Sequence, residues 1–173
     1  MRSYDFALSF ALPANETQPD DIAERCYSQG CDDALIGIGQ HGRVGFEFTR
    51  EASSALQAIT SALADVQRIV PGARLIEASP DLVGLTDIAN LLGVSRQNMR
   101  KFLVRNGSQF PLPVHEGNPA IWHLATVLEW FADMKGRTTN ETLLDIARVN
   151  MHCNVLKDVA ELDASITAKF TLR

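Results

Sequence analysis

The stretch LTDIANLLGVSRQNMRKF, residues 85–102, largely decides the fold that we predict for this 173-residue chain. Its pattern of apolar and polar residues indicates two short helices with little chain between them. Thr86 is a candidate cap for the first helix and Ser95 for the second. Between them, Gly93 supplies the left-handed backbone that a tight turn between helices requires. We therefore expect two helices that pack at an angle through one short turn.

Apolar residues mark the sides by which these two helices pack. The residues that we expect to face inward are Ile88, Ala89, Leu92, Met99, Phe102, Leu103 and Val104. Ala89 is small where the second helix must approach closely, and Val94 is placed to fill the angle between the helices. This spacing resembles the helix-turn-helix of DNA-binding regulators, in which positions such as Ala89, Gly93 and Met99 pack the two helices.

The outward side of the second helix is basic. Arg96, Arg100, Lys101 and Arg105 fall in a ten-residue stretch that contains no acid. Guanidinium and amide groups can make paired contacts with guanine and adenine edges, worth roughly 1–3 kcal/mol each. The alternative is an ordinary pair of helices with a solvated basic face, but such a face more often mixes Glu with Lys.

Residues 110–134 extend the pattern downstream. FPLPV and PAIWH, separated by HEGN, predict two short strands joined by a turn at Gly117-Asn118, and Trp122 and Trp130 supply core for a small unit. A helix follows from Leu124 to about Met134. In this order, residues 82–134 resemble the winged-helix domains of the MerR superfamily and of phage excisionase or prophage regulatory proteins.

The resemblance implies a recognition helix from Ser95 to about Asn106 in the major groove of double-stranded DNA, with the hairpin as a wing over the sugar-phosphate backbone. The residues that it places on DNA are Ser95, Arg96, Gln97, Asn98, Arg100, Lys101 and Arg105. In one respect the chain departs from the family, because its wing offers His115 and Glu116 where those wings usually carry Arg or Lys. We expect a sequence-specific transcription regulator, with an excisionase-type DNA-bending factor as an alternative.

Upstream, residues 1–79 alternate between strand and helix patterns. The predicted strands are 4–12, 34–38, 44–48 and 73–78, and the predicted helices are 20–29 and 51–70. Thr49 is a candidate cap for the second helix, and Gly39 to Gly42 form the hairpin between the middle strands. This order predicts a ferredoxin-like βαββαβ unit, in which two helices cover one face of an antiparallel sheet. The chain as a whole is therefore expected to be α+β.

Charge separates the two parts of the chain. The formal net charge is −5, and residues 1–80 carry six basic and eleven acidic side chains, whereas residues 81–135 carry five of each. Overall acidity argues against a general polyanion binder. When the net charge is counted separately for the two parts, the chain consists of an acidic unit attached to a region with a basic helix. We expect the acidic unit to serve for dimer contacts, ligand sensing or partner binding. A second hypothesis is therefore a protein-interaction module, such as an antitoxin or defence-system accessory factor, that also binds DNA.

Residues 136–173 form a tail in which a helix is predicted from about Asn140 to Asp163. Two neighbouring apolar stripes run along it: Leu143, Ile146, Val149, Cys153, Leu156 and Ala160, and Leu144, Ala147, Met151, Val155, Val159 and Leu162. So broad an apolar face must be covered, either by the rest of the chain or by a second subunit. We favour a homodimer, because two recognition helices can read two half-sites.

Several other patterns carry weaker signals. Gly37, Gly39 and Gly42 match a dinucleotide-binding spacing, but that motif requires its glycines to open a helix, and here a strand pattern resumes at Arg43. Asp32 and Asp33 would diverge in an extended segment, so we assign them to a loop between helix and strand.

The remaining reactive residues do not form a recognisable catalytic or metal-binding set. Cys26, Cys31 and Cys153 are unclustered, which favours neither a disulfide framework nor a zinc site and fits a reducing compartment. The histidines lack a visible nucleophile and orienting acid. We expect a cytoplasmic protein that is not an enzyme, with no cofactor, no metal and no membrane span.

Overall fold

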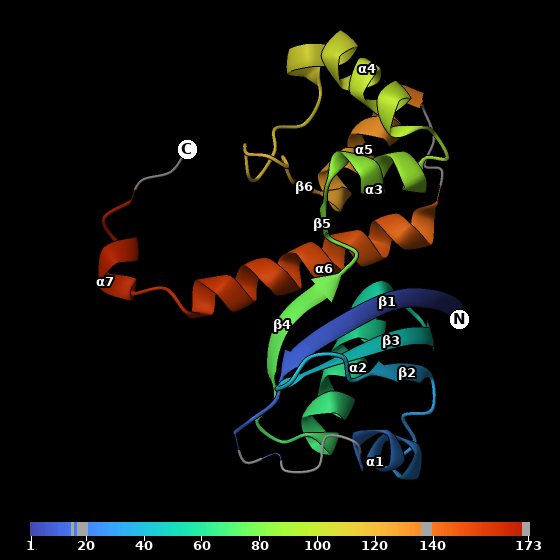
Figure 1. Ribbon diagram of the computed structural model, residues 1–173, viewed down its shortest axis with the longest axis vertical. Helices are drawn as coiled ribbons and strands as arrows, with labels where there is room; N and C mark the ends of the chain where they lie inside the picture. Colours follow the sequence, from blue (N-terminus) through green and yellow to red (C-terminus); the bar gives the residue numbers. More distant parts are fainter. Residues whose placement is uncertain (15, 17–20, 136–139, 171–173) are drawn as a thin grey trace.

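The computed structural model describes residues 1–14, 16, 21–135 and 140–170. The fold is mixed α+β, with a four-stranded antiparallel sheet and the helices labelled α1 to α7 in the described residues. Figure 1 shows the long helix α6 crossing the molecule between the sheet, with α1 and α2, and a group formed by α3, α4 and α5. Among the described residues, no helix combines the length and apolar character needed to cross a membrane.

The sheet has the strand order β2-β3-β1-β4, and every neighbouring pair is antiparallel. Its strands are β1 (Arg2–Ala11), β2 (Ala34–Gly37), β3 (Arg43–Ala52) and β4 (Arg74–Ser79). The strand predicted over residues 4–12 is confirmed as β1, in which every second residue, Tyr4, Phe6, Leu8 and Phe10, is buried. On the adjacent strand Phe48 lies opposite Phe6, and the two rings stack with centroids 5.1 Å apart.

Two helices, α1 (Ile22–Ser28) and α2 (Ala55–Ile69), pack on the aromatic face of the sheet. Asp20, the predicted first residue of α1, lies outside the described residues. The predicted start of α2 at residue 51, with Thr49 as its cap, is wrong. β3 continues to Ala52, which pairs with Arg2 of β1, and Ser54 caps α2 by accepting a hydrogen bond from the Gln57 amide at 3.2 Å.

The second group begins at β5 (Leu82–Val83) and continues through α3 (Leu85–Leu91) and α4 (Arg96–Asn106). A short 3₁₀ turn, η2 (Gly107–Gln109), leads to β6 (Trp122–His123) and α5 (Leu124–Lys135). Its core contains a cluster of aromatic rings in mutual contact: Phe102, Phe110, Trp122, Trp130 and Phe131. The predicted contribution of both tryptophans to this core is confirmed.

The predicted hairpin around Gly117-Asn118 is much reduced. One antiparallel bridge joins His115 to Ile121, while β6 pairs with β5 and not with the segment before the turn. The sequence of this segment explains the difference, because Pro111, Pro113 and Pro119 have no amide N–H to donate to a ladder. The Trp122 indole instead donates to the Pro111 carbonyl at 3.0 Å.

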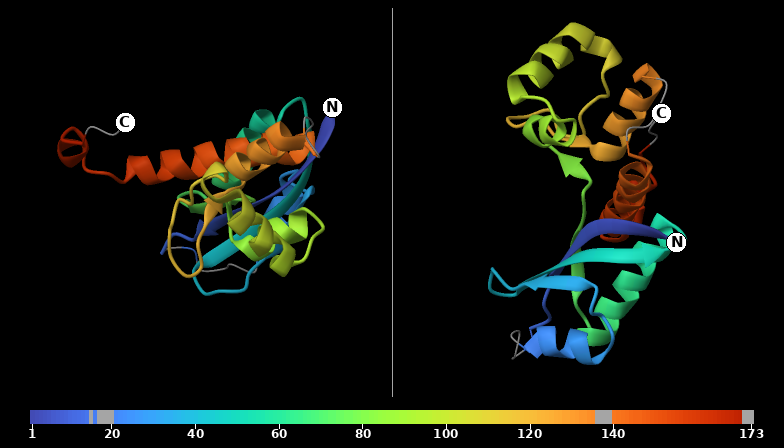
Figure 2. Two further views of the ribbon diagram at one scale, coloured as in Figure 1. Left: turned by 90° about the horizontal axis from the view of Figure 1, so that it is seen from above. Right: turned by 90° about the vertical axis from the view of Figure 1, so that its right-hand side faces the viewer.

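Helix α6 (Glu141–Ala160) joins the two groups, and the short α7 (Ala164–Thr167) follows it. Ile146 belongs to the core beneath the sheet, whereas Leu144 and Ala147 belong to the core of the second group. Packing on its own chain therefore covers the first half of the α6 apolar face. Only the end of α6 extends beyond the sheet toward α7, as Figure 2 shows from above, and Val155, Leu156 and Val159 are exposed there.

Candidate nucleic-acid interface

The turn between α3 and α4 is built as its residues predict, with two corrections. Gly93 has φ +66° and Ser95 Oγ accepts from the Asn98 amide at 3.2 Å, so both predicted roles are confirmed. Thr86 is not a cap: it lies inside α3, where the Asp87 carboxylate accepts from the Gly84 amide at 2.8 Å. Val94 does not fill the angle between the helices, because 41% of it is exposed.

All seven residues that we predicted to contact DNA are exposed on or beside α4: Ser95, Arg96, Gln97, Asn98, Arg100, Lys101 and Arg105. None of the four cations among them forms an ion pair with a described residue. Five residues of α4 line one shallow hollow of about 480 Å³: Gln97, Arg100, Lys101, Val104 and Arg105. These positions recur at helical spacing, so they share one face.

The opposite side of α4 is fixed to the aromatic core. Met99 is 2% exposed, and the Phe102 ring stacks on Phe131 with centroids 5.3 Å apart and meets Trp130 edge-on at 5.6 Å. At the end of the helix, the side-chain amide of Asn106 donates a hydrogen bond to the Phe102 carbonyl at 2.7 Å. The basic face is thus presented by a helix whose own position is held by packing.

One inward assignment on α4 is wrong. Val104 is 73% exposed and lies among the polar residues of the outer face. Met99, Phe102 and Leu103 already occupy the side that meets the core. Because successive residues of a helix turn by about 100°, the residue after Leu103 points away from that core. An apolar side chain therefore interrupts the basic face.

The segment predicted as a wing offers little positive charge. His115 and Glu116 are exposed, and residues 108–123 contain no Lys or Arg. The His115 ring folds over Gly117, where a Cβ would collide with it, so the tip of the turn is closely packed. This segment has backbone amides and a histidine to offer to a phosphate, but no strong base.

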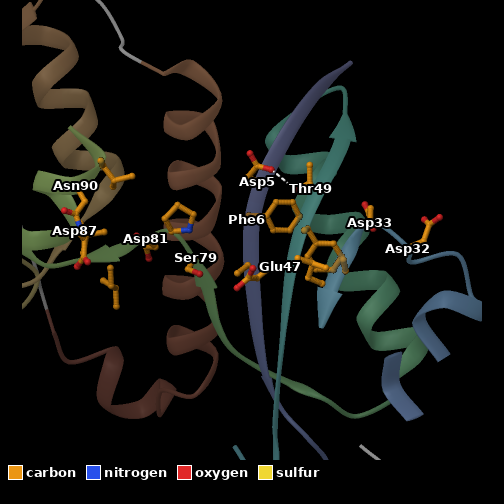
Figure 3. Close-up of a pocket in the computed structure, with 18 residues that line it drawn as sticks. Asp5, Phe6, Asp32, Asp33, Glu47, Thr49, Ser79, Asp81, Asp87 and Asn90 are labelled. Atoms are coloured by element: carbon orange, nitrogen blue, oxygen red, sulfur yellow. Dashed lines mark hydrogen bonds between the residues drawn. The ribbon is translucent and has the colours of Figure 1, made fainter. Parts of the chain in front are cut away.

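A second feature is a cleft of about 820 Å³ between α3 and the face of the sheet that α1 and α2 leave uncovered. Figure 3 shows Glu47 and Ser79 on the sheet side, and Asp87 and Asn90 on α3 across the cleft. The register places Ala7 of β1 between Glu47 and Ser79, so a small residue forms the floor.

The lining of this cleft is acidic and partly apolar. Its carboxylates are Asp5, Asp32, Asp33, Glu47, Asp81 and Asp87, and no Lys, Arg or His lines it among the described residues. Three exposed leucines contribute the apolar part: Leu35, Leu82 and Leu91. Sequence reasoning missed the cleft because its residues come from five separate segments, and Asp32-Asp33 gave no signal beyond a loop.

Four of these carboxylates make hydrogen bonds within the fold. Asp87 accepts from the Gly84 amide, and Asp5 accepts from the Thr49 hydroxyl at 2.8 Å. Asp33 accepts two hydrogen bonds from Arg50, at 2.6 and 2.9 Å. Asp81 is buried; one of its oxygens lies 2.7 Å from His123 Nδ1 and the other accepts from Asn154 at 2.8 Å. Asp32 and Glu47, by contrast, form no ion pair with a described residue. Asp32 and Glu47 therefore bring uncompensated negative charge to the cleft.

The weaker motifs occupy structural positions. Gly37 ends β2 and Arg43 begins β3, so the three glycines of the dinucleotide-like spacing lie in a strand end and a hairpin, as predicted. Cys26 and Cys31 are buried free thiols, and burial raises the pKa of both, that of Cys31 to about 11. In the described part of the chain, no group of three or more His, Cys, Asp or Glu side chains is arranged to hold a metal ion.

Comparison with known proteins gives no match to a family model, a curated protein or a solved structure.

Proposed function

We propose that this chain is a sequence-specific DNA-binding transcription regulator that acts in the cytoplasm and inserts α4 into the major groove. The observation that carries the proposal is the outer face of α4, where Arg96, Arg100, Lys101 and Arg105 are exposed and engaged in no ion pair with a described residue. Cations without an acidic partner in the described part of the chain are available for phosphates and base edges.

The rigidity of α4 supports the same proposal. A helix that reads bases has to place its side chains to within a fraction of an ångström. In α4, Met99 is buried in the core and Phe102 packs on the rings of Trp130 and Phe131. Acidic residues elsewhere would repel DNA, so contact outside α4 is disfavoured. This charge distribution lowers non-specific affinity relative to specific affinity.

The proposal includes a finer description of the fold. Residues 1–79 would form a ferredoxin-like unit, which the β2-β3-β1-β4 order and the two helices on one face support. Residues 80–135 would form a winged helix-turn-helix domain with a short wing, and residues 136–173 a helical tail. Because α6 contributes to both cores, the tail also joins the two units.

We further propose that the protein binds DNA as a homodimer through the distal part of α6 and α7. Exposed apolar residues continue from the end of α6 through α7: Val155, Leu156, Val159, Leu162, Ile166 and Phe170. The described part of the chain leaves them exposed, whereas Leu144, Ile146 and Ala147 in the first half of α6 are buried. A twofold-related copy would cover them and supply a second recognition helix.

Selection of bound duplexes from random sequence by the full chain tests the DNA-binding proposal. We expect an enriched motif that occurs as two half-sites at a fixed spacing, with an affinity that falls steeply as salt rises. Recovery of a pool with no enriched motif would contradict sequence-specific binding. The same duplex with a shuffled motif, used as a competitor, measures how much of the affinity is independent of sequence.

The acidic cleft favours a second candidate function, a protein-interaction module that masks another protein. Its uncompensated Asp32 and Glu47, together with exposed Leu35, match a partner segment that carries both basic and apolar side chains. If this second function holds, a basic protein should co-purify with the chain, and the double variant Asp32→Lys, Glu47→Lys should no longer retain it. The matched pair Glu24→Lys and Glu51→Lys, both exposed and outside the cleft, should retain it.

A further inference from the structure

Val104 is an exposed apolar residue at the centre of an otherwise polar helix face. It is 73% exposed and lines the same hollow as Gln97, Arg100, Lys101 and Arg105. Single exposed apolar residues are common on proteins, so exposure alone assigns no role. The informative point is its position, one turn beyond Arg100 and Lys101, on the face that the proposed function turns toward base edges.

Thymine presents a matching group in the major groove. Its C5-methyl is the apolar group that protrudes there, whereas cytosine has only a hydrogen at this position and the purine edges present hydrogen-bond donors and acceptors. An isopropyl group packs on a methyl but leaves a donor or acceptor desolvated and unpaired. A valine at this place therefore discriminates for thymine by contact and against other bases by desolvation.

We propose that Val104 reads a thymine methyl group and thereby sets one position of the DNA site recognised by α4. This inference rests on the proposed function of α4 given above. It assigns the specificity of the face to three side chains of different chemistry: Gln97 for adenine, Arg100 for guanine and Val104 for thymine. Lys101 and Arg105 are left for phosphates or a second guanine.

Helix geometry gives the approximate order of these bases. With a rise of about 1.5 Å per residue, Gln97 and Arg100 are separated by roughly 4.5 Å along α4, and Arg100 and Val104 by roughly 6 Å. Base pairs follow one another every ~3.4 Å. With α4 lying along the groove, Arg100 reads about one base pair beyond Gln97, and Val104 about two base pairs beyond Arg100.

The neighbours of Val104 argue against a contact between two copies at this residue. Arg100, Lys101 and Arg105 surround it, so a second α4 at the same face would bring like charges together. A polyanion with an apolar group in its groove satisfies both the cations and the valine. DNA that contains thymine has this chemistry.

Replacing the selected thymine by deoxyuridine tests the inference, because it removes the methyl group alone. We expect the affinity of the wild-type protein to fall about three- to tenfold, as for loss of one buried methyl contact. Val104→Ala should bind the thymine site more weakly and respond little to uracil. Val104→Thr, which keeps one methyl, should retain part of the response. Uracil outside the half-sites and the variant Val94→Ala serve as controls that leave affinity unchanged.

The outcomes separate this inference from the function on which it rests. An enriched site with no thymine about two base pairs from the guanine, or an equal uracil effect in wild type and Val104→Ala, overturns the role of Val104 and leaves DNA reading by α4 intact. Failure to enrich any site overturns both. Thermal unfolding of each variant checks that the exposed substitution leaves the fold unchanged.

Discussion

Arg50 is a buried cation that holds one wall of the acidic cleft in place. Its guanidinium binds Asp33 and also reaches Asp65 at 2.9 Å, and it lies 4.9 Å from the centre of the Phe48 ring. Burial alone would lower the pKa of Arg50, but the hydrogen bonds and charges of Asp33 and Asp65 outweigh burial and raise it. The arginine therefore stays charged and fixes the loop that carries Asp32 and Asp33.

Next to this network, Cys31 should make the free energy of unfolding depend on pH in the alkaline range. Burial first, and then the charges of Cys26 and Asp33, raise the pKa of the Cys31 thiol from 9.0 to about 11. Above pH 9 the unfolded chain releases this proton while the native chain keeps it, so the free energy of unfolding should fall as pH rises from about 9 toward 11. Urea unfolding at pH 8 and pH 10 measures the fall.

The variant Cys31→Ala isolates this contribution, because all other titrating groups remain. Its free energy of unfolding should decrease less between pH 8 and pH 10 than that of the wild type. Equal decreases in the two proteins would show that the thiol does not titrate differently in the folded chain.

At the scale of elements, one asparagine of α6 joins the helix to the edge of the sheet. Asn154 accepts from the Ala78 amide and donates to the Ala78 carbonyl, both at 2.8 Å, as a neighbouring strand would. It also donates to buried Asp81, at the start of the segment that leads to β5. This side chain therefore pairs with the open edge of β4 at Ala78 and links it to the group formed by α3, α4 and α5.

Asn154→Ala should lower the free energy of unfolding by about 2–4 kcal/mol, because it leaves buried backbone groups and a carboxylate without a partner. Asn150→Ala is a matched control on the same helix. Asn150 donates one hydrogen bond, to the Pro80 carbonyl at 3.2 Å, and its own Oδ1 has no partner among the described residues, so its loss should cost less. Urea unfolding of both variants measures the difference, and an equal or smaller loss for Asn154→Ala would contradict this assignment.

Elements with local signals could be predicted from sequence, and those set by distant contacts could not. Period-two alternation located β1, and Gly93 with Ser95 located the turn before α4, because each signal lies within a few residues. The start of α2 was misplaced because pairing with Arg2, far away in the sequence, extends β3 through residues that also fit a helical pattern.

The candidate site shows the same division. Basic residues of α4 could be assigned to an outer face from charge alone, whereas Val104 was assigned inward because it is apolar. Its true direction depends on which residues fill the core before it, namely Met99, Phe102 and Leu103. Asn154 and the acidic cleft gave no local signal, since their partners lie in other elements.

For the whole molecule, the distal part of α6 should decide the oligomeric state. Leu156→Glu with Leu162→Glu places charges on the exposed stripe, where each residue is more than half exposed at 65% and 58%. We expect a dimeric wild type and a monomeric variant by analytical ultracentrifugation. Binding to DNA with two half-sites should then weaken by about 100-fold or more, while binding to one half-site changes little.

Leu112→Glu is the control for this experiment, because Leu112 is 86% exposed and lies outside the stripe. It should remain dimeric. A wild type that is monomeric at all concentrations, or a double variant that remains dimeric, would contradict dimerisation through α6 and α7.

The central claim is that α4 reads DNA through its basic face, and the affinity of the Arg96→Ala, Arg100→Ala double variant for a selected site tests it most directly. Arg43→Ala with Arg74→Ala is the matched control, since both residues are exposed arginines of the sheet. We predict that the α4 variant loses about 100-fold or more in affinity, keeps its thermal stability, and that the control binds nearly as well as the wild type. Unchanged affinity of the α4 variant would contradict the claim.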